Sequence, residues 1–218
     1  KILGEARVNI VYSSTSKYSI TNGNSFVLQY HQQSNSATPT ADYYRCFSPL
    51  AANESAAWAN MLMLADSYNH LSFNSKSTEG CWDNFDRYVT DSIIRWVWNP
   101  DGSLDLYVCN GSDESQLSKY VPTLQAGNYL GKAGLFTYTT TGYLFLMGNS
   151  YQGTAVIDNV KFGQATSSSA NPTWLVDSGN KPSNYFQVGS CTSASAKITD
   201  GASDFITENP STKTGVLY

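Results

Sequence analysis

Residues 93–111, IIRWVWNPDGSLDLYVCNG, hold two runs of alternating side-chain character separated by Asn-Pro-Asp-Gly. Alternation with a period of two is typical of a strand that buries one of its faces. Pro100-Asp101-Gly102 and Asn110-Gly111 are turn sequences, because Gly and Asn tolerate the positive φ angles that tight turns require. The stretch therefore predicts a β-hairpin with strands over 92–98 and 104–109.

The same alternation recurs along the 218-residue chain. It predicts further strands over residues 7–12, 26–31, 43–47, 133–138, 143–147, 155–162, 185–188 and 195–198. Many short strands between turn residues indicate an all-β fold, with two antiparallel sheets packed as a sandwich or jelly roll. Residues 54–66, ESAAWANMLMLAD, are the exception: they favour either a short helix with Asn53 as its N-cap or a covered strand.

The composition changes at residues 164–170, QATSSSA, which is typical of a linker or an exposed excursion. We therefore divide the chain into a β-sandwich over 1–163 and a C-terminal extension over 164–218. Residues 171–218 contain too few apolar side chains for a core of their own, so we expect the extension to pack on the sandwich.

The charge and hydropathy of the chain exclude some partners. With 13 Lys+Arg against 17 Asp+Glu, the net charge is −4, so we expect no nucleic-acid partner. No apolar run approaches the roughly 20 residues that a membrane-spanning helix needs, so we expect no membrane insertion. The sequence starts at Lys1 with no basic-then-apolar leader, which favours a secreted or cell-surface protein whose leader has been removed.

Four cysteines, Cys46, Cys81, Cys109 and Cys191, show no C-x-x-C pair or zinc-knuckle spacing. An even number of cysteines in a chain rich in Ser, Thr, Asn and Tyr predicts two disulfides formed in an oxidising compartment. Three pairings are open. The alternative is that Cys109, inside the apolar run LDLYVC, is a buried thiol.

Residues 82–163 resemble the second half of the concanavalin A-like, or laminin-G-like, jelly roll. The motifs that carry the resemblance are the Pro100-Asp101-Gly102 turn, the strand that ends on Asn110-Gly111, and Asp158-Asn159-Val160-Lys161-Phe162 in a late strand. The resemblance implies a two-sheet jelly roll. Lectins, adhesion domains, glycanases and polysaccharide lyases share these motifs, so the resemblance specifies the fold better than the activity.

The resemblance also suggests one metal ligand. Asp158 matches a position that often holds a structural calcium ion in such sandwiches, and carboxylate oxygens suit calcium. The alternative is that Asp158 caps a turn and binds no metal. We expect no cofactor to be required.

The chain has the side chains that glycan recognition uses, with 15 Tyr and 5 Trp among many amides and carboxylates. Trp96 and Trp98 point to one face of their predicted strand. They form a sugar platform if that face is exposed, or core residues if it is buried. With Tyr30, Tyr107 and Asn110 as further ligand-binding candidates, we expect a lectin-like or adhesin-like carbohydrate-binding module without catalysis.

One alternative is a polysaccharide lyase. On a strand, Gln29 and His31 project side by side, and they resemble the Gln-x-His pair of jelly-roll lyases that cleave uronic-acid polymers by β-elimination. The resemblance implies that Gln29 neutralises the uronate carboxylate, while His31 and a tyrosine, matched here by Tyr129, act as base and acid. The net negative charge of the chain is poorly suited to an acidic polymer.

A further alternative is a subunit of a surface filament or adhesion structure. The Tyr, Ser and Thr side chains of the predicted strands would then serve assembly. Self-assembly would use the C-terminal extension, residues 164–218, as an interaction arm.

Overall fold

The computed structural model describes most of the sandwich. The described residues are 2–3, 8–34, 43–59, 62–64, 70–73, 81–82, 91–120, 130–150, 154–168, 171–191, 196–198, 200 and 215–217. None of the helices in these ranges has the length and hydropathy that a membrane-spanning segment needs.

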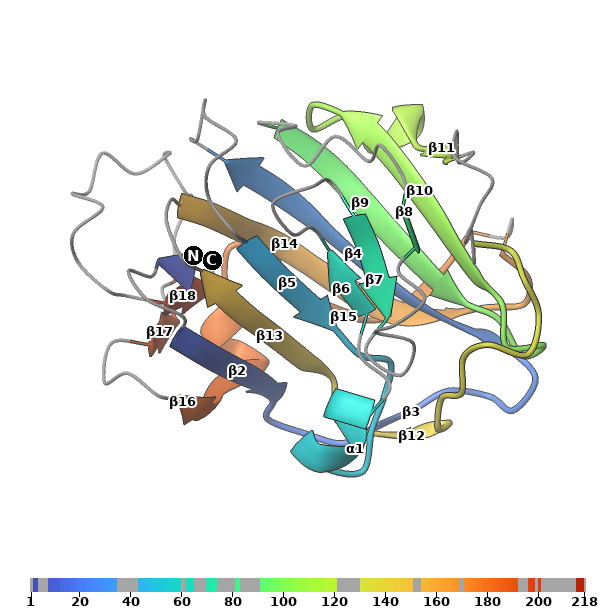
Figure 1. Ribbon diagram of the computed structural model, residues 1–218, viewed down its shortest axis with the longest axis horizontal. Helices are drawn as coiled ribbons and strands as arrows, with labels where there is room; N and C mark the ends of the chain where they lie inside the picture. The colour runs from blue at the N-terminus through green and yellow to red at the C-terminus, as the bar shows by residue number, and fades with distance from the viewer. Residues whose placement is uncertain are drawn as a thin grey trace.

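Two β-sheets form the two layers of the molecule (Figure 1). Sheet A has the order β11 (Ser118–Lys119), β10 (Leu104–Asn110), β9 (Asp91–Trp98), β4 (Ser25–Ser34), β14 (Thr154–Ala165), β1 (Ile2–Leu3), β18 (Gly215–Leu217) and β17 (Ala196–Ile198), with β15 (Thr173–Asp177) paired to β14. Sheet B has the order β16 (Phe186–Cys191), β2 (Val8–Ser14), β13 (Phe145–Ser150), β5 (Tyr43–Phe47), β6 (Leu62–Leu64), β7 (His70–Phe73) and β8 (Cys81–Trp82). The short β3 (Tyr18–Ser19) and β12 (Thr141–Gly142) pair with each other. The expected all-β fold of antiparallel sheets is confirmed, and β17 and β18 add one parallel pair.

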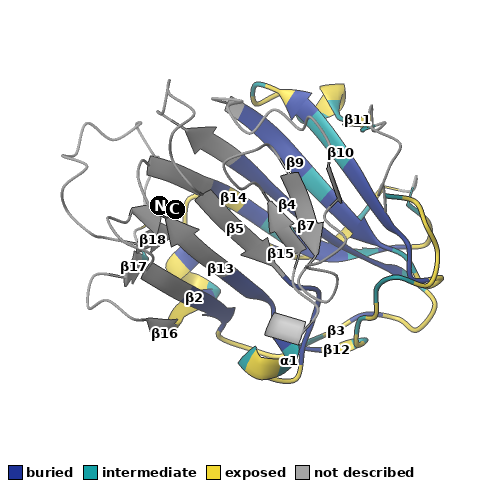
Figure 2. Cartoon of the chain, viewed as in Figure 1, coloured by how far each residue is buried: buried dark blue, intermediate teal, exposed yellow. Residues whose placement is uncertain are grey.

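The core lies between the two sheets and follows the alternation of the sequence. Phe26, Leu28 and Tyr30 of β4 face it together with Trp96 and Trp98 of β9, and all five have relative exposures of 0–1%. Residues of sheet B close the core from the other side. Figure 2 shows the buried residues following β4, β9 and β10. The intervening residues of these strands must therefore point to the outer face of sheet A.

Residues 54–66 contain both of the structures that the sequence leaves open. Helix α1 (Glu54–Ala59) occupies the first half of the segment, and β6 occupies part of the second half. The Asn53 side-chain oxygen accepts a hydrogen bond from the Ala56 backbone N–H at 2.9 Å, so the predicted N-cap is confirmed.

The predicted strand over residues 133–138 is wrong. The backbone N–H groups of Leu135 and Phe136 both bond to the Gly102 carbonyl, at 3.1 and 2.9 Å, and the Gly134 N–H bonds to the Asp101 carbonyl at 2.8 Å. The segment therefore packs its backbone on the β9–β10 turn instead of joining a sheet. Alternation in the sequence does not show which backbone partner a segment will find.

Residues 164–218 contribute to both sheets. β15 pairs with β14, β16 pairs with β2, and β17 and β18 lie beyond β1 in sheet A. β14 itself continues to Ala165, and the Tyr107 hydroxyl donates a hydrogen bond to the Ser168 carbonyl at 2.9 Å. The stretch expected to be a linker is thus in part strand and in part fixed on the outer face of sheet A.

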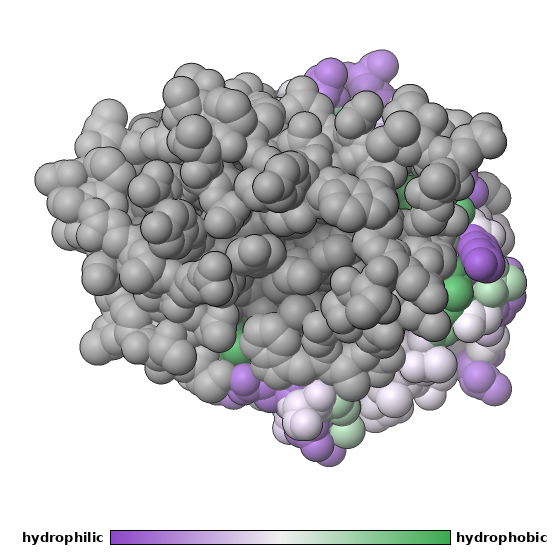
Figure 3. All heavy atoms as spheres, viewed as in Figure 1, coloured by the Kyte–Doolittle hydropathy of each residue, from purple (hydrophilic) through white to green (hydrophobic). Residues whose placement is uncertain are grey.

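Few large apolar side chains of the described residues are exposed. Figure 3 shows hydrophilic and neutral side chains along the rim of this view, with hydrophobic ones only in small groups. The large apolar side chains classed as exposed in the described ranges are Leu175, at 37%, and Val188, at 39%. No broad apolar patch in these ranges points to a protein partner.

The β9–β10 turn has no room for a side chain at Gly102. Gly102 has φ +79°, and a Cβ there would lie 2.9 Å from the Phe136 carbonyl oxygen and 3.0 Å from the Gly134 nitrogen. Gly23 has a similar φ of +86° and nothing within 4 Å of an added Cβ. The two glycines therefore separate the cost of backbone strain from the cost of a steric clash.

We expect Gly23→Ala to lower the free energy of unfolding by about 1–2 kcal/mol, because Ala is strained at positive φ. Gly102→Ala should cost about 1–3 kcal/mol more, because the methyl group also displaces the 134–136 backbone. Urea unfolding measures both. Equal losses for the two variants would contradict the packing of residues 134–136 on this turn.

Candidate functional site

The candidate site lies on the outer face of sheet A, opposite the core. Gln29 and His31 project from β4 to this face because Leu28 and Tyr30 point inward. Arg95 of the neighbouring β9 pairs in register with Gln29. Polar and charged side chains of two adjacent strands thus meet on one face.

A β-bulge in β14 adds two more charged side chains to this face. Asp158 pairs with His31 and Lys161 pairs with Gln29, so three steps along β14 match two steps along β4. The extra residue is accommodated at Asn159, which has φ +47°. Without the bulge, residues three apart would point to opposite faces; with it, Asp158 and Lys161 both reach the outer face.

A short loop after β10 completes the site. Gly111 turns the chain with φ +79°, and the Asp113 side chain accepts a hydrogen bond from the Ser115 N–H at 3.0 Å. This contact caps η2 (Glu114–Gln116), a single turn of 3-10 helix. The loop then returns to sheet A as β11, which pairs with β10. Glu114 is thereby held over β4 and β14.

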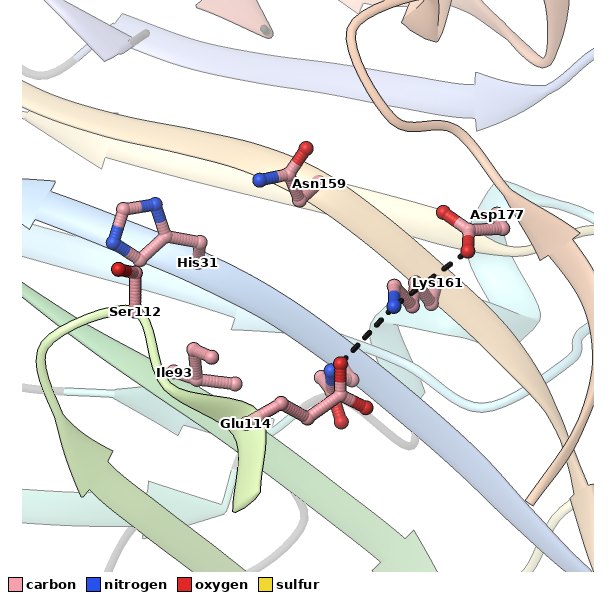
Figure 4. Close-up of a pocket in the computed structure, with 8 residues that line it drawn as sticks. His31, Ile93, Ser112, Glu114, Asn159, Lys161 and Asp177 are labelled. Atoms are coloured by element: carbon pink, nitrogen blue, oxygen red, sulfur yellow. Dashed lines mark hydrogen bonds and ion pairs between the residues drawn. The ribbon is translucent and has the colours of Figure 1, made fainter. Parts of the chain in front are cut away.

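These elements enclose a pocket of about 290 Å³. Figure 4 shows Lys161 between Glu114 and Asp177. The pocket is lined by Gln29, His31, Ile93, Ser112, Glu114, Asn159, Lys161 and Asp177. Hydrogen-bond donors and acceptors are therefore mixed around one small cavity.

Glu114 is the centre of the ionic contacts. Arg95 donates to one of its carboxylate oxygens at 3.2 Å, and Lys161 donates to the other at 3.1 Å. Arg95 Nε also donates to the Gln29 side-chain oxygen at 2.7 Å, and Lys161 lies 3.5 Å from Asp177. Burial lowers the pKa of Arg95, although the Glu114 carboxylate acts in the opposite direction.

His31 and Asp158 form a buried pair at the other end of the pocket. His31 Nδ1 lies 2.8 Å from Asp158 Oδ1, and each side chain is only 10% exposed. A carboxylate at this distance fixes the orientation of the imidazole and favours a proton on Nδ1. His31, which lines the pocket, is thereby held in one orientation.

An indole lies beside the charged residues. Trp174 of β15 has the Arg95 guanidinium carbon and the Lys161 ammonium nitrogen each 5.8 Å from its ring centroid, within the range of cation–π attraction. It also packs with Tyr107 against a small apolar cluster on the outer face of sheet A. The ring thus supplies a half-buried apolar wall next to the ion pairs.

Of the two alternatives for Trp96 and Trp98, the core is confirmed and the sugar platform is wrong. Trp96 and Trp98 do share one face of β9, but that face is the core, and their exposures are 0% and 1%. Tyr30 is 0% exposed, and its hydroxyl accepts a hydrogen bond from Trp96 Nε1 at 3.1 Å. None of these three rings can stack on a ligand that approaches from solvent.

The other predicted residues have different positions. Gln29 and His31 lie side by side in the pocket, whereas Tyr129 lies outside the described residues. Tyr107 is on the outer face of sheet A with its hydroxyl bonded to Ser168. Asn110 is exposed at the end of β10.

Asp158, the candidate calcium ligand, lies beside His31. One of its carboxylate oxygens is in contact with His31, which is not a usual calcium ligand. Within the described ranges, no three His, Cys, Asp or Glu side chains gather as a metal ion's ligands would. Calcium also accepts backbone carbonyl oxygens, so the calcium site at Asp158 stays a prediction.

Cys109 is a buried thiol, which is the alternative that the sequence left open. Its sulfur lies 3.4 Å from the Asp113 carbonyl oxygen, in the loop that carries Glu114. Two disulfides that use all four cysteines are therefore excluded in this structure. The side chains of Cys46, Cys81 and Cys191 lie outside the described residues.

Sequence reasoning missed Arg95, Glu114, Lys161, Asp177 and Trp174. The period of two in β9 placed Arg95 opposite Trp96, which was a usable signal once the indoles were assigned to the core. For Lys161 the sequence Asp158-Asn159 offered a weak sign of a bulge, since Asn tolerates positive φ. Nothing local in the sequence predicts that Glu114 and Asp177 meet at Lys161.

Comparison of the chain with protein-family models, with curated proteins and with solved structures gives no match.

The ion pairs of Glu114 predict a pH dependence of stability. Burial alone would raise the pKa of Glu114, but hydrogen bonds from Gln29 and Lys161 and the charges of Lys161 and Arg95 outweigh it and lower the pKa. A lowered pKa in the folded state stabilises the protein above the carboxyl's unfolded pKa, about 4.3, and this stabilisation is lost as the pH falls through the folded pKa. Glu114→Gln lacks it at every pH.

We expect wild type to melt roughly 1–3 °C above Glu114→Gln at pH 7, a small effect because the Glu114 side chain is 40% exposed. The difference should shrink as the pH falls below about 4.3. Thermal unfolding followed by circular dichroism measures it. Glu54→Gln on α1 controls for the loss of one carboxyl group. A difference in melting temperature between wild type and Glu114→Gln that stays constant to low pH would contradict the lowered pKa of Glu114.

Proposed function

We propose that the protein is a non-catalytic carbohydrate-binding module whose pocket on the outer face of sheet A holds one neutral sugar unit of a glycan. The observation that carries the proposal is the mixture of donors and acceptors in a pocket whose charges compensate one another. Amide, hydroxyl, ammonium and carboxylate groups all line this pocket of about 290 Å³. Sugar hydroxyls both donate and accept, so such a mixture suits them.

The charge balance favours a neutral ligand over a polyanion. Lys161 lies between Glu114 and Asp177, and Arg95 is paired with Glu114. Asp158 faces His31. An acidic polymer would meet cations that already have carboxylate partners, together with further negative charge. The resemblance of residues 82–163 to concanavalin A-like domains, which include lectins, supports carbohydrate binding but does not choose between neutral and acidic glycans.

Apolar surface beside the pocket also suits a sugar. Ile93 lines the cavity, and the Trp174 ring lies next to Lys161. The C–H face of a sugar ring packs well on such apolar and aromatic groups. The predicted role of aromatic residues in binding is therefore assigned to Trp174 in place of Trp96 and Trp98.

The second candidate is a polysaccharide lyase, which is favoured by the His31–Asp158 pair beside Gln29. In β-elimination, His31 would take the C5 proton of a uronate while the C4–O4 bond breaks. The electron pair forms the C4–C5 double bond, and an acid returns a proton to the leaving oxygen. Gln29 would face the substrate carboxylate, but its side-chain oxygen is already bonded to Arg95.

The two candidates are separated by offering the protein immobilised neutral and uronic-acid polysaccharides and by following the ultraviolet absorbance of unsaturated uronate products. We expect retention on a neutral glycan and no absorbance change. A rise in absorbance that is lost in His31→Ala would overturn the proposal and establish a lyase. Absence of retention on every neutral glycan would also contradict it.

A lysine substitution tests whether the pocket is the binding site. Lys161→Gln should weaken binding of the retained glycan about tenfold, because it removes a charge-assisted donor from the cavity. Lys181→Gln, at a lysine that is 61% exposed and does not line the pocket, should leave affinity unchanged. Isothermal titration calorimetry measures both, and equal affinities for the two variants would place the site elsewhere.

A further inference from the structure

The carboxylate of Glu114 has the surroundings of a bound ligand. Arg95 and Lys161 donate to its two oxygens at 3.2 and 3.1 Å, from two strands of sheet A. Gln29, on the strand between them, lines the same pocket as Glu114. Two cations and an amide around one carboxylate are the donors that proteins use to bind acidic ligands.

We propose that Gln29, Arg95 and Lys161 form a carboxylate-binding site that Glu114 fills in cis, so that the loop over residues 110–117 competes with an external carboxylate ligand. The three donors lie on β-strands, whereas the Glu114 carboxylate that they bind lies on a loop. The three donors stand on adjacent strands of sheet A. Glu114 stands on a single 3-10 turn between β10 and β11.

The donors keep their arrangement through contacts that do not involve Glu114. Arg95 Nε is bonded to Gln29 at 2.7 Å, and Lys161 is paired with Asp177. Trp174 lies 5.8 Å from both cations. Removal of the Glu114 carboxylate therefore leaves a prearranged receptor.

The exposures of the side chains agree with Arg95 and Lys161 being the fixed donors and Glu114 being the group that a ligand displaces. The Arg95 and Lys161 side chains are 16% and 21% exposed, whereas Glu114 is 40% exposed. The occupant is thus the more solvated partner and the easier one to displace. Because loop closure and ligand binding exclude each other, the apparent affinity for an external carboxylate falls by the fraction of molecules in which the loop is open.

The rest of the pocket indicates which carboxylates fit. Ser112, Asn159 and Asp177 line the cavity next to Lys161, and all three can bond to hydroxyl groups. The ligand class is therefore a hydroxylated carboxylate such as a single uronic acid. This inference is independent of the neutral-sugar proposal, because neutral sugars are expected to bind with Glu114 in place.

The test is titration of sodium glucuronate into wild type, Glu114→Ala and Glu114→Gln, followed by tryptophan fluorescence in buffers without carboxylates. We expect Glu114→Ala to bind glucuronate at least about tenfold more tightly than wild type, since one competing charged hydrogen-bonded group is removed. Glu114→Gln, which keeps the size but loses the charge, should show a smaller gain. Glu54→Ala removes a carboxylate elsewhere and should show none.

A second substitution tests whether the increase in glucuronate affinity depends on the proposed donors. Adding Arg95→Gln to Glu114→Ala should abolish the gain for glucuronate. Melting curves establish that each variant is folded, and Glu114→Gln takes the place of Glu114→Ala if the latter is not. A folded Glu114 variant that binds glucuronate no better than wild type would overturn the inference, and would show that Glu114 only stabilises the loop.

Glucose is titrated in parallel as the neutral analogue. Glucuronate binding gained on loss of Glu114 supports the carboxylate site whether or not neutral glycans are retained. Equal gains for glucose and glucuronate would also overturn the inference, because they would show that Glu114 blocks the pocket by its size alone. Failure of the neutral-sugar proposal is therefore distinguishable from failure of this one.

Discussion

The extra residue in β14 determines which side chains form the pocket. The bulge at Asn159 brings Asp158 and Lys161 to the same face, where they pair in register with His31 and Gln29 of β4. A regular strand would direct one of the two toward the core, where an unpaired charge is costly. The His31–Asp158 pair and the Lys161 contacts thus depend on a single backbone irregularity.

The candidate site and the core lie on opposite faces of sheet A. The inner face of sheet A is almost entirely apolar, and the Trp96–Tyr30 hydrogen bond satisfies two of its polar atoms. The outer face instead satisfies its charges by pairing, with Glu114 as the shared partner of two cations. Such partly exposed pairs contribute little to stability.

Sequence patterns predicted the parts of this structure that depend on local chemistry. The period of two in residues 26–31 and 92–98 predicted β4 and β9 and placed Gln29 beside His31. It could not say which face of β9 was buried, because Trp suits a core and a sugar platform equally. It also could not place Glu114 or Asp177, because their proximity to the site depends on strand order and on a one-residue shift in pairing.

Because the pocket lies outside the core, substitutions of its side chains leave the packing between the sheets intact. The core is formed by side chains on the inner faces of the sheets, and none of the three proposed carboxylate donors belongs to it. Loss of one outer-face side chain therefore removes contacts in the pocket without opening a cavity between the sheets. The loop that carries Glu114 is joined to sheet A by the short pairing of β11 with β10. An external ligand that displaced Glu114, as we propose, would move a loop that is held by this short pairing.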